Sequence, residues 1–311
     1  MTTSFLFTFD CTKFCELHPF SQPFIEYLKF EKRYSAHTVR AYSDDLGQFF
    51  LFLTQTFGEV SLKDISPSFI RSWLAAMKEQ KITSKSINRK ISSLKSFFKY
   101  QLRAEVLQKS PMSAIISPRS GKRLPVYVEE KDMLLLTREV EFPDTWQGKT
   151  DHLVIQIFYN TGMRLAELVN LKDNQLDEAA QMIRVLGKGN KERLIPLSSL
   201  LVEEIRLYRK EKRVSGRNLP ETLLVSDKGK PLYVKYAYLA VRKWLSLVTT
   251  ISRKSPHVLR HSFATHLMNH GAELNSVKEL LGHSSLAATQ LYLHNSIEKL
   301  RQVHQKSHPR A

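Results

Sequence analysis

A break in the periodic pattern over residues 109–126 is the feature that most constrains how this chain folds. The segment holds three prolines and a glycine among serines and basic residues, and neither helical nor strand periodicity crosses it. At 311 residues the chain is long enough for two domains, each with its own core. We therefore expect an N-terminal extension over residues 1–20, a first domain over 21–108, a linker over 109–126 and a second domain over 127–311.

Upstream of the linker, apolar residues recur at the spacing of a helix. The pattern predicts helical segments that begin near Phe24, run from Val39 to Leu53, run from Phe69 to Met77, and run from Ile87 to Leu102. Ser66 precedes a proline at the first helical position, which is typical of a helix start. The first domain is therefore predicted to be helical.

Downstream of the linker, the pattern is mixed. Two β-prone runs, Gln181–Leu186 and Glu192–Leu197, flank a Gly-Lys-Gly-Asn turn and predict a hairpin. Helical patterns surround this hairpin at Leu153–Tyr159, Arg164–Leu171, Leu200–Lys212, Tyr236–Val248 and most of Leu259–His294. The whole chain is therefore expected to be mainly α, with a small antiparallel sheet in its second domain, since too few strands remain for a parallel sheet.

The charge balance points to a polyanionic partner. The chain carries 47 Lys and Arg against 30 Asp and Glu, a net charge of +17, and both halves are basic. Such an excess favours nucleic acid ahead of an anionic membrane. On the last predicted helix of the first domain, the apolar face lies opposite a basic face that also carries serines, and this basic face predicts DNA contact through Lys85, Arg89, Lys99 and Arg103. A merely solvated charged face is the alternative.

Compartment signals are few but agree with one another. Cys11 and Cys15 are the two cysteines, too few for a disulfide framework. No apolar run approaches the length of a membrane span, and the N-terminus lacks the pattern of a secretory signal. These features predict a cytoplasmic protein with no membrane partner.

Two clusters in the second domain place a cation beside glycine. In Thr161-Gly-Met-Arg164, the arginine follows a glycine at the start of a predicted helix. Lys188 lies between two glycines at the predicted hairpin tip, where the backbone can approach a groove closely. Taken alone, each residue could equally be an ordinary surface cation.

Two further clusters carry histidine, arginine and tyrosine. His257 and Arg260 are three residues apart and so share one face of a predicted helix, where a guanidinium could bind phosphate oxygens and an imidazole could move a proton. His283 follows a helix-ending glycine, and Tyr292 comes nine residues later. A buried, hydrogen-bonded tyrosine is the usual alternative to a nucleophile.

Metal binding is the rival explanation for the histidines. His266 and His270 have i, i+4 spacing, yet the glutamate of His-Glu-x-x-His is absent and no acidic ligand cluster accompanies them. We therefore predict no metal site.

Taken together and in this order, four segments resemble the tyrosine recombinases and their Xer branch. They are Thr-Gly-Met-Arg164-Leu-Ala-Glu, Leu-Gly-Lys188-Gly-Asn-Lys-Glu-Arg, Ser-Pro-His257-Val-Leu-Arg260-His, and Leu-Gly-His283-Ser-Ser with Tyr292. The resemblance runs from about Phe24 to the C-terminus. It implies a four-helix, SAM-like core-binding domain followed by a helical catalytic domain with a small sheet.

The resemblance also implies a role for each residue. Tyr292 would attack the scissile phosphate, Arg164, Arg260 and His283 would bind its oxygens, Lys188 would protonate the leaving oxygen, and His257 would assist proton transfer. Glu167, one turn after Arg164, would orient that arginine. No metal or nucleotide cofactor is required, because cations stabilise the charge and the phosphotyrosine conserves the bond.

By the same resemblance, the partner is double-stranded DNA, held by a homo- or hetero-tetramer on two sites. Such proteins act on chromosome dimers as a XerC–XerD-type pair controlled by an FtsK-type translocase. A terminal helix at about 296–307 would dock into a neighbouring subunit, or else pack on its own domain. The alternatives are a recombinase of a plasmid, phage or mobile element, a relaxing topoisomerase, a non-catalytic DNA-binding regulator and a metal-dependent nuclease.

Overall fold

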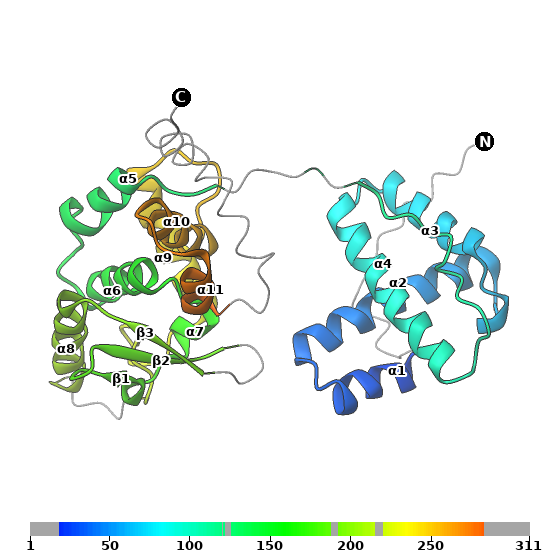
Figure 1. Cartoon of the computed structure of the whole chain (residues 1–311), viewed down its shortest axis with the longest axis horizontal. Coiled ribbons are helices and arrows are strands. Elements are labelled where there is room, and N and C mark those ends of the chain that lie inside the picture. Colours follow the sequence, from blue (N-terminus) through cyan, green and yellow to red (C-terminus); the bar gives the residue numbers. More distant parts are fainter. Residues whose placement is uncertain (1–18, 120, 122–125, 188–191, 215–219, 283–311) are drawn as a thin grey trace, which may run out of the picture. The chain divides into compact units, whose positions relative to one another are not determined.

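A computed structural model describes residues 19–119, 121, 126–187, 192–214 and 220–282. The chain divides into two compact units, Met1–Arg123 and Leu124–Ala311, each with its own hydrophobic core. The mainly helical fold with one small antiparallel sheet is confirmed (Figure 1). No helix among the described residues is both long and apolar enough to cross a bilayer.

The first unit is a bundle of helices. α1 (Gln22–Glu26) continues into a π-helical turn (Tyr27–Glu31) and is followed by α2 (Ala36–Phe57), a short 3₁₀ turn (Leu62–Asp64), α3 (Pro67–Glu79) and α4 (Ser84–Arg103). The hydroxyls of Ser35 and Thr83 accept backbone N–H groups at the starts of α2 and α4, which explains where these helices begin. Ser66 does precede α3, but its hydroxyl bonds that of Ser68 instead of a backbone N–H.

Aromatic side chains fill the core of this unit. Phe49, Trp73, Phe97 and Phe98 are fully buried and stack edge to face. They lie on α2, α3 and α4, so the apolar stripes expected from the sequence all meet in one core. The opposite face of α4 stays exposed.

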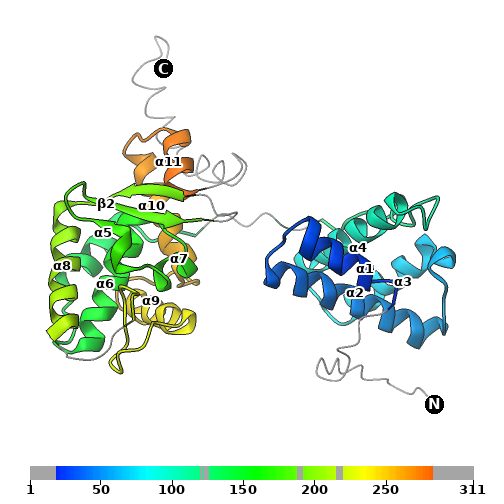
Figure 2. The same ribbon diagram turned by 90° about the horizontal axis from the view of Figure 1, so that it is seen from below.

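The second unit builds helices around a central one. The elements are α5 (Glu130–Leu134, continued by a π-helical turn, Leu135–Glu139), α6 (Trp146–Thr161), α7 (Leu165–Val169), β1 (Leu176–Asp177), β2 (Met182–Leu186), β3 (Glu192–Pro196), α8 (Ser199–Val214), α9 (Val234–Val248), α10 (Pro256–Asn269) and α11 (Leu274–Leu281). α6 contacts α8, α9 and α10, which surround it (Figures 1 and 2).

The sheet has the order β1-β2-β3 and is antiparallel. Ile183 pairs with Ile195, and Val185 pairs with Arg193. The side chains of Ile183, Val185 and Ile195 are buried, while those of Arg184 and Leu194 are exposed, so the strands alternate as expected for a sheet with one packed face. The hairpin prediction was therefore right, whereas the two-residue β1 was not expected.

Candidate active site

Arg164 stands at the junction of two helices. α6 ends at Gly162, whose φ of 58° is left-handed, and Arg164 is the N-cap of α7. Its Nη1 donates to Glu167 Oε1 (2.8 Å), and its backbone N–H donates to Glu167 Oε2 (2.7 Å). Its Nη2 donates to the carbonyl oxygen of Gly282 (2.7 Å), 118 positions along the chain. The side chain is thereby held in one orientation from both ends of its guanidinium.

Arg260 lies on α10 and is only 5% exposed. Its Nη1 donates to the carbonyl of Gly162 (2.7 Å), and its Nη2 donates to the carbonyl of Leu281 (2.6 Å). Arg164 and Arg260 therefore bind successive carbonyls at the C-terminal end of α11. The structure brings these two predicted site residues together from distant elements.

α10 is buried over most of its length. Every residue from Val258 to His266 is buried. Arg260 is therefore buried, whereas His257 is exposed. Although their spacing places His257 and Arg260 on one face of the helix, they differ in exposure, because α6, α9 and α11 all pack against α10.

Arg193 is a nearly buried cation that the sequence interpretation missed. Its Nη1 and Nη2 donate to Glu167 Oε1 (3.0 Å) and Oε2 (2.7 Å), and its Nε donates to the carbonyl of Leu280 (2.8 Å). The alternation of β3 does contain a signal, since Arg193 and Ile195 must face the same way. A charged residue on the packed face of a strand requires a buried partner.

The carbonyls of Leu280, Leu281 and Gly282, which we call the carbonyl triplet, thus each accept from a different arginine. Arg193, Arg260 and Arg164 donate to them in that order. The last carbonyls of a helix have no partner within the helix and form the negative end of its dipole. The three guanidinium groups give these carbonyls hydrogen-bond donors and place positive charge at the negative end of the helix dipole, immediately before His283.

Glu167 carries the charge that balances two of these arginines. Burial raises the pKa of Glu167, but hydrogen bonds from Arg193 and Arg164 outweigh that effect and leave the pKa below its ordinary value. Its side chain is 7% exposed, so the carboxylate is an ionised group inside the protein. The contact with Arg164 was expected, and the shared contact with Arg193 was not.

The histidines of α10 have separate environments. Burial, with a smaller contribution from His257, lowers the pKa of His261 to about 4. His266 contacts the carbonyl of Val128 through Nε2 (3.0 Å) and the Tyr159 hydroxyl through Nδ1 (3.0 Å). His270 pairs with Glu130. These contacts anchor the segment at the start of α5, and no group of three or more metal-binding side chains occurs in the part of the chain that the structure describes.

Three predicted site residues, Lys188, His283 and Tyr292, lie outside the described residues, as do residues 1–18 and the expected terminal helix at 296–307. β2 and β3 place Lys188 in the connection of the hairpin, and α11 ends immediately before Gly282. Gly282 has a φ of 62°, which confirms the expected helix-ending glycine.

On α4, the four basic residues predicted to contact DNA are all exposed. Two of them have partners within the protein. Arg89 Nη1 binds Asp45 Oδ2 (2.5 Å), and Arg103 donates to the Tyr27 hydroxyl (2.8 Å). Asp45 comes from α2, is fully buried, and also binds Lys90 and Ser93, so the acid that accompanies this basic face lies far away in sequence.

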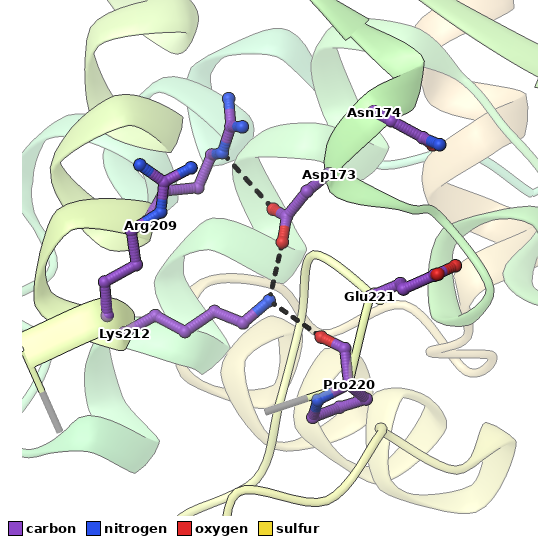
Figure 3. Close-up of a pocket in the computed structure, with 7 residues that line it drawn as sticks. Asp173, Asn174, Arg209, Lys212, Pro220 and Glu221 are labelled. Carbon is purple, nitrogen blue, oxygen red and sulfur yellow. Dashed lines mark hydrogen bonds and ion pairs between the residues drawn. The ribbon is translucent and has the colours of Figure 1, made fainter. Parts of the chain in front are cut away.

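In the second unit, a charged cavity of about 430 Å³ lies between α8 and the turn that contains Asp173 (Figure 3). Two of its cations already have acceptors, because Lys212 binds Asp173 (2.8 Å) and the carbonyl of Thr222 (2.6 Å), and Arg209 binds Asp173 and Glu178. None of the predicted catalytic residues that the structure describes lines it. We interpret it as a structural ion-pair network.

Comparisons with known proteins agree with this geometry. Residues 127–299 match the phage integrase family, and residues 22–105 match the phage integrase N-terminal SAM-like domain. The chain is 36% identical to the tyrosine recombinase XerC of Staphylococcus saprophyticus, covering 93% of this chain and 97% of that one. It is 33% identical to the XerC of Chlorobaculum tepidum, with 93% and 94% covered.

Solved structures show the same fold. XerH bound to a palindromic difH substrate in a post-cleavage complex superposes with a TM-score of 0.73 at 22% identity, covering 92% of this chain and 84% of that one. A lambda integrase dimer bound to a COC′ core site gives a TM-score of 0.68 at 18% identity, with 89% and 94% covered.

Proposed function

The chain belongs to the phage integrase family and is a site-specific tyrosine recombinase of the Xer branch, and on that premise we propose how its residues divide the chemistry. Tyr292 is the nucleophile and forms a 3′-phosphotyrosyl link to DNA. Arg164, Arg260 and His283 bind the non-bridging oxygens of the scissile phosphate. His257 assists proton transfer at Tyr292, and Glu167 orients Arg164.

The reaction conserves the phosphodiester bond. The phenolic oxygen of Tyr292 forms a bond to phosphorus as the bond from phosphorus to the 5′-oxygen breaks, and Lys188 gives that oxygen a proton. A 5′-hydroxyl of another strand then attacks the phosphotyrosine and releases Tyr292. Because each step exchanges one phosphate ester for another, no nucleotide is consumed.

The observation that carries this proposal is the convergence of Arg164 and Arg260 on the end of α11. Both side chains are held by hydrogen bonds to backbone carbonyls, those of Gly162, Leu281 and Gly282. Preorganised cations stabilise charge that develops at phosphorus without reorganising during the reaction. His283 follows these carbonyls directly and would join the same phosphate.

Double-stranded DNA is the partner we infer, in keeping with the difH substrate bound by XerH and the COC′ core site bound by lambda integrase. Lys85, Arg89, Lys99 and Arg103 would contact it from the first unit, with residues 109–126 as a linker. The relatives named XerC favour a cytoplasmic role in resolving chromosome dimers at cell division, by a tetramer that includes a XerD-type protein under an FtsK-type translocase.

A terminal helix at about 296–307 would dock into a neighbouring subunit of that tetramer. Deleting the residues from Ser296 onward should therefore weaken the pairing of two DNA sites more than the binding to one site.

Trapping the covalent intermediate tests the function and identifies the target site in the same experiment. Purified protein is incubated with nicked genomic fragments in EDTA, and DNA joined to protein is recovered and sequenced. Recovery of one recurring site, with the phosphate on Tyr292 by peptide mass spectrometry, is the expected result. An absence of any DNA-linked protein would contradict the proposal, and DNA cleavage that requires a divalent ion and leaves no protein on the DNA would favour a nuclease.

A further inference from the structure

Arg193 occupies an unusual place for a charged side chain. It lies on β3, on the same inward-facing side of the strand as Ile195, and its side chain is only 10% exposed. Removing a guanidinium from water costs several kcal/mol, by an order-of-magnitude estimate, unless good hydrogen bonds replace the lost hydration. We therefore expect an arginine on the packed face of a strand to make contacts that have a structural or catalytic role.

Its three contacts use the planar shape of the guanidinium. Two nitrogens bind the two oxygens of Glu167, and the third binds the carbonyl of Leu280. A lysine has a single nitrogen and cannot span these acceptors in the same way. The geometry thus depends on arginine in particular, and not on positive charge alone.

Glu167 transmits the position of Arg193 to Arg164. The same carboxylate accepts the backbone N–H and Nη1 of Arg164, so it lies between the two arginines. Without Arg193, Glu167 would lose two of its donors inside the protein and could rotate or take up a proton. Either change would release Arg164 from the orientation that the structure shows.

Arg193 also supports the end of α11. It binds the first member of the carbonyl triplet, while Arg260 and Arg164 bind the other two. Its side chain packs against the turn as well, since a Cβ placed on Gly282 would lie 3.2 Å from Arg193 Cδ. The residue after that turn is His283.

The hairpin supplies the third connection. Arg193 pairs with Val185 across the strands and is five residues after Lys188. One side chain therefore joins the hairpin that carries Lys188, the acid that holds Arg164 and the helix end that precedes His283.

We propose that Arg193 is a positioning residue for DNA cleavage, which holds Arg164 in its orientation through Glu167 and fixes the end of α11, without touching the substrate. This inference rests on the proposed function. It predicts that loss of Arg193 slows the chemical step and leaves DNA binding nearly unchanged, whereas a residue needed only for stability would lower the melting temperature and leave the cleavage rate of folded protein unaltered.

The test measures single-turnover cleavage at saturating concentrations of a nicked duplex that contains the trapped site. Arg193→Met should cleave about 10- to 100-fold more slowly than wild type, as expected for misplaced catalytic groups. Its Kd for the same duplex, from gel shift, should stay within about twofold, since the phosphate contacts that dominate affinity are elsewhere. Arg193→Lys should recover only part of the rate.

Two further variants sharpen the interpretation. Arg206→Met, which removes an exposed ion pair with Glu203 on α8, should cleave like wild type. Combining Arg193→Met with Glu167→Gln should be no slower than the slower single variant, because both act through one carboxylate. Rates that multiply would contradict a shared route.

The outcomes separate the two proposals. If wild type forms no covalent adduct, the proposed function fails and this inference falls with it. If wild type cleaves and folded Arg193→Met cleaves at the same rate, only the role of Arg193 is overturned. Should Arg193→Met be unfolded by circular dichroism at the assay temperature, Arg193→Lys decides, and a wild-type rate in that variant would overturn the inference.

Discussion

The buried guanidinium of Arg260 donates a hydrogen bond to the carbonyl oxygen of Gly162, 2.7 Å away. Gly162 ends α6 in a left-handed conformation, and Arg164 follows two residues later. The turn at Gly162, which positions Arg164, is thus held by a hydrogen bond from Arg260. Any change in this turn should disturb Arg164 and Arg260 together.

Gly162→Ala tests that dependence. A side chain at a left-handed residue costs about 1–3 kcal/mol, and a Cβ here would lie 2.3 Å from Phe263 Cδ1. We expect lower stability in urea unfolding and strongly reduced cleavage. Gly47→Ala is the matched control, because Gly47 lies within α2 with open space around it and should gain about 0.5–1 kcal/mol. A neutral Gly162→Ala would show that the turn is not constrained.

Lys188→Ala should slow cleavage of an ordinary phosphodiester, because the leaving 5′-oxygen needs a proton. General acid catalysis contributes about 10²- to 10⁴-fold. A substrate with sulfur at the bridging 5′ position has a leaving group that requires no acid, so the variant should cleave it at nearly the wild-type rate. Equal losses on both substrates would exclude Lys188 as the acid.

The basic face of α4 should reveal itself in the salt dependence of DNA binding. Lys85→Ala and Lys99→Ala should each reduce the slope of log K against log salt by about 0.9, if each lysine neutralises one phosphate. Lys78→Ala, an exposed lysine on α3, is the control and should leave the slope unchanged. An unaltered slope in all three variants would favour the solvated-face interpretation.

His261 should make the protein less stable in mild acid. Its folded pKa of about 4 lies below the ordinary value of 6.5, so the unfolded chain binds the proton more readily between these values. Stability should therefore fall as the pH drops from 6.5 towards 4. His261→Gln should flatten this part of a curve of unfolding free energy against pH, and exposed His37→Gln should not. Parallel curves for wild type and His261→Gln would contradict the assignment.

Local pattern was sufficient for much of the fold. The hairpin, the stripe of α4 and the proline start of α3 depend on residues close in sequence, and the strands lie within one residue of the predicted ends. α10 shows what periodicity does not predict. Helices were expected over most of Leu259–His294, and in the described part α10 ends at Asn269 and α11 begins at Leu274. The polar residues of α10 are buried because α6, Val128 and α11 lie against them.

The candidate site likewise has a part that local motifs predicted and a part that depends on tertiary packing. Arg164 and Arg260 were recognised from motifs that surround them, and their convergence on α11 was not predictable from spacing. Arg193 had no motif of its own, and its partners are 26 and 87 positions away. Likewise, Asp45 neutralises Arg89 from another helix. Such pairs arise from tertiary packing, which the local pattern of residues along the chain does not predict.

The central claim is that the hydroxyl of Tyr292 becomes joined to DNA, and one comparison tests it directly. Wild type and Tyr292→Phe are incubated in EDTA with a nicked duplex carrying the trapped site, and denaturing gels separate protein bound covalently to DNA. We predict that Tyr292→Phe binds the duplex as tightly as wild type but forms no covalent complex. A covalent complex in Tyr292→Phe would contradict the account.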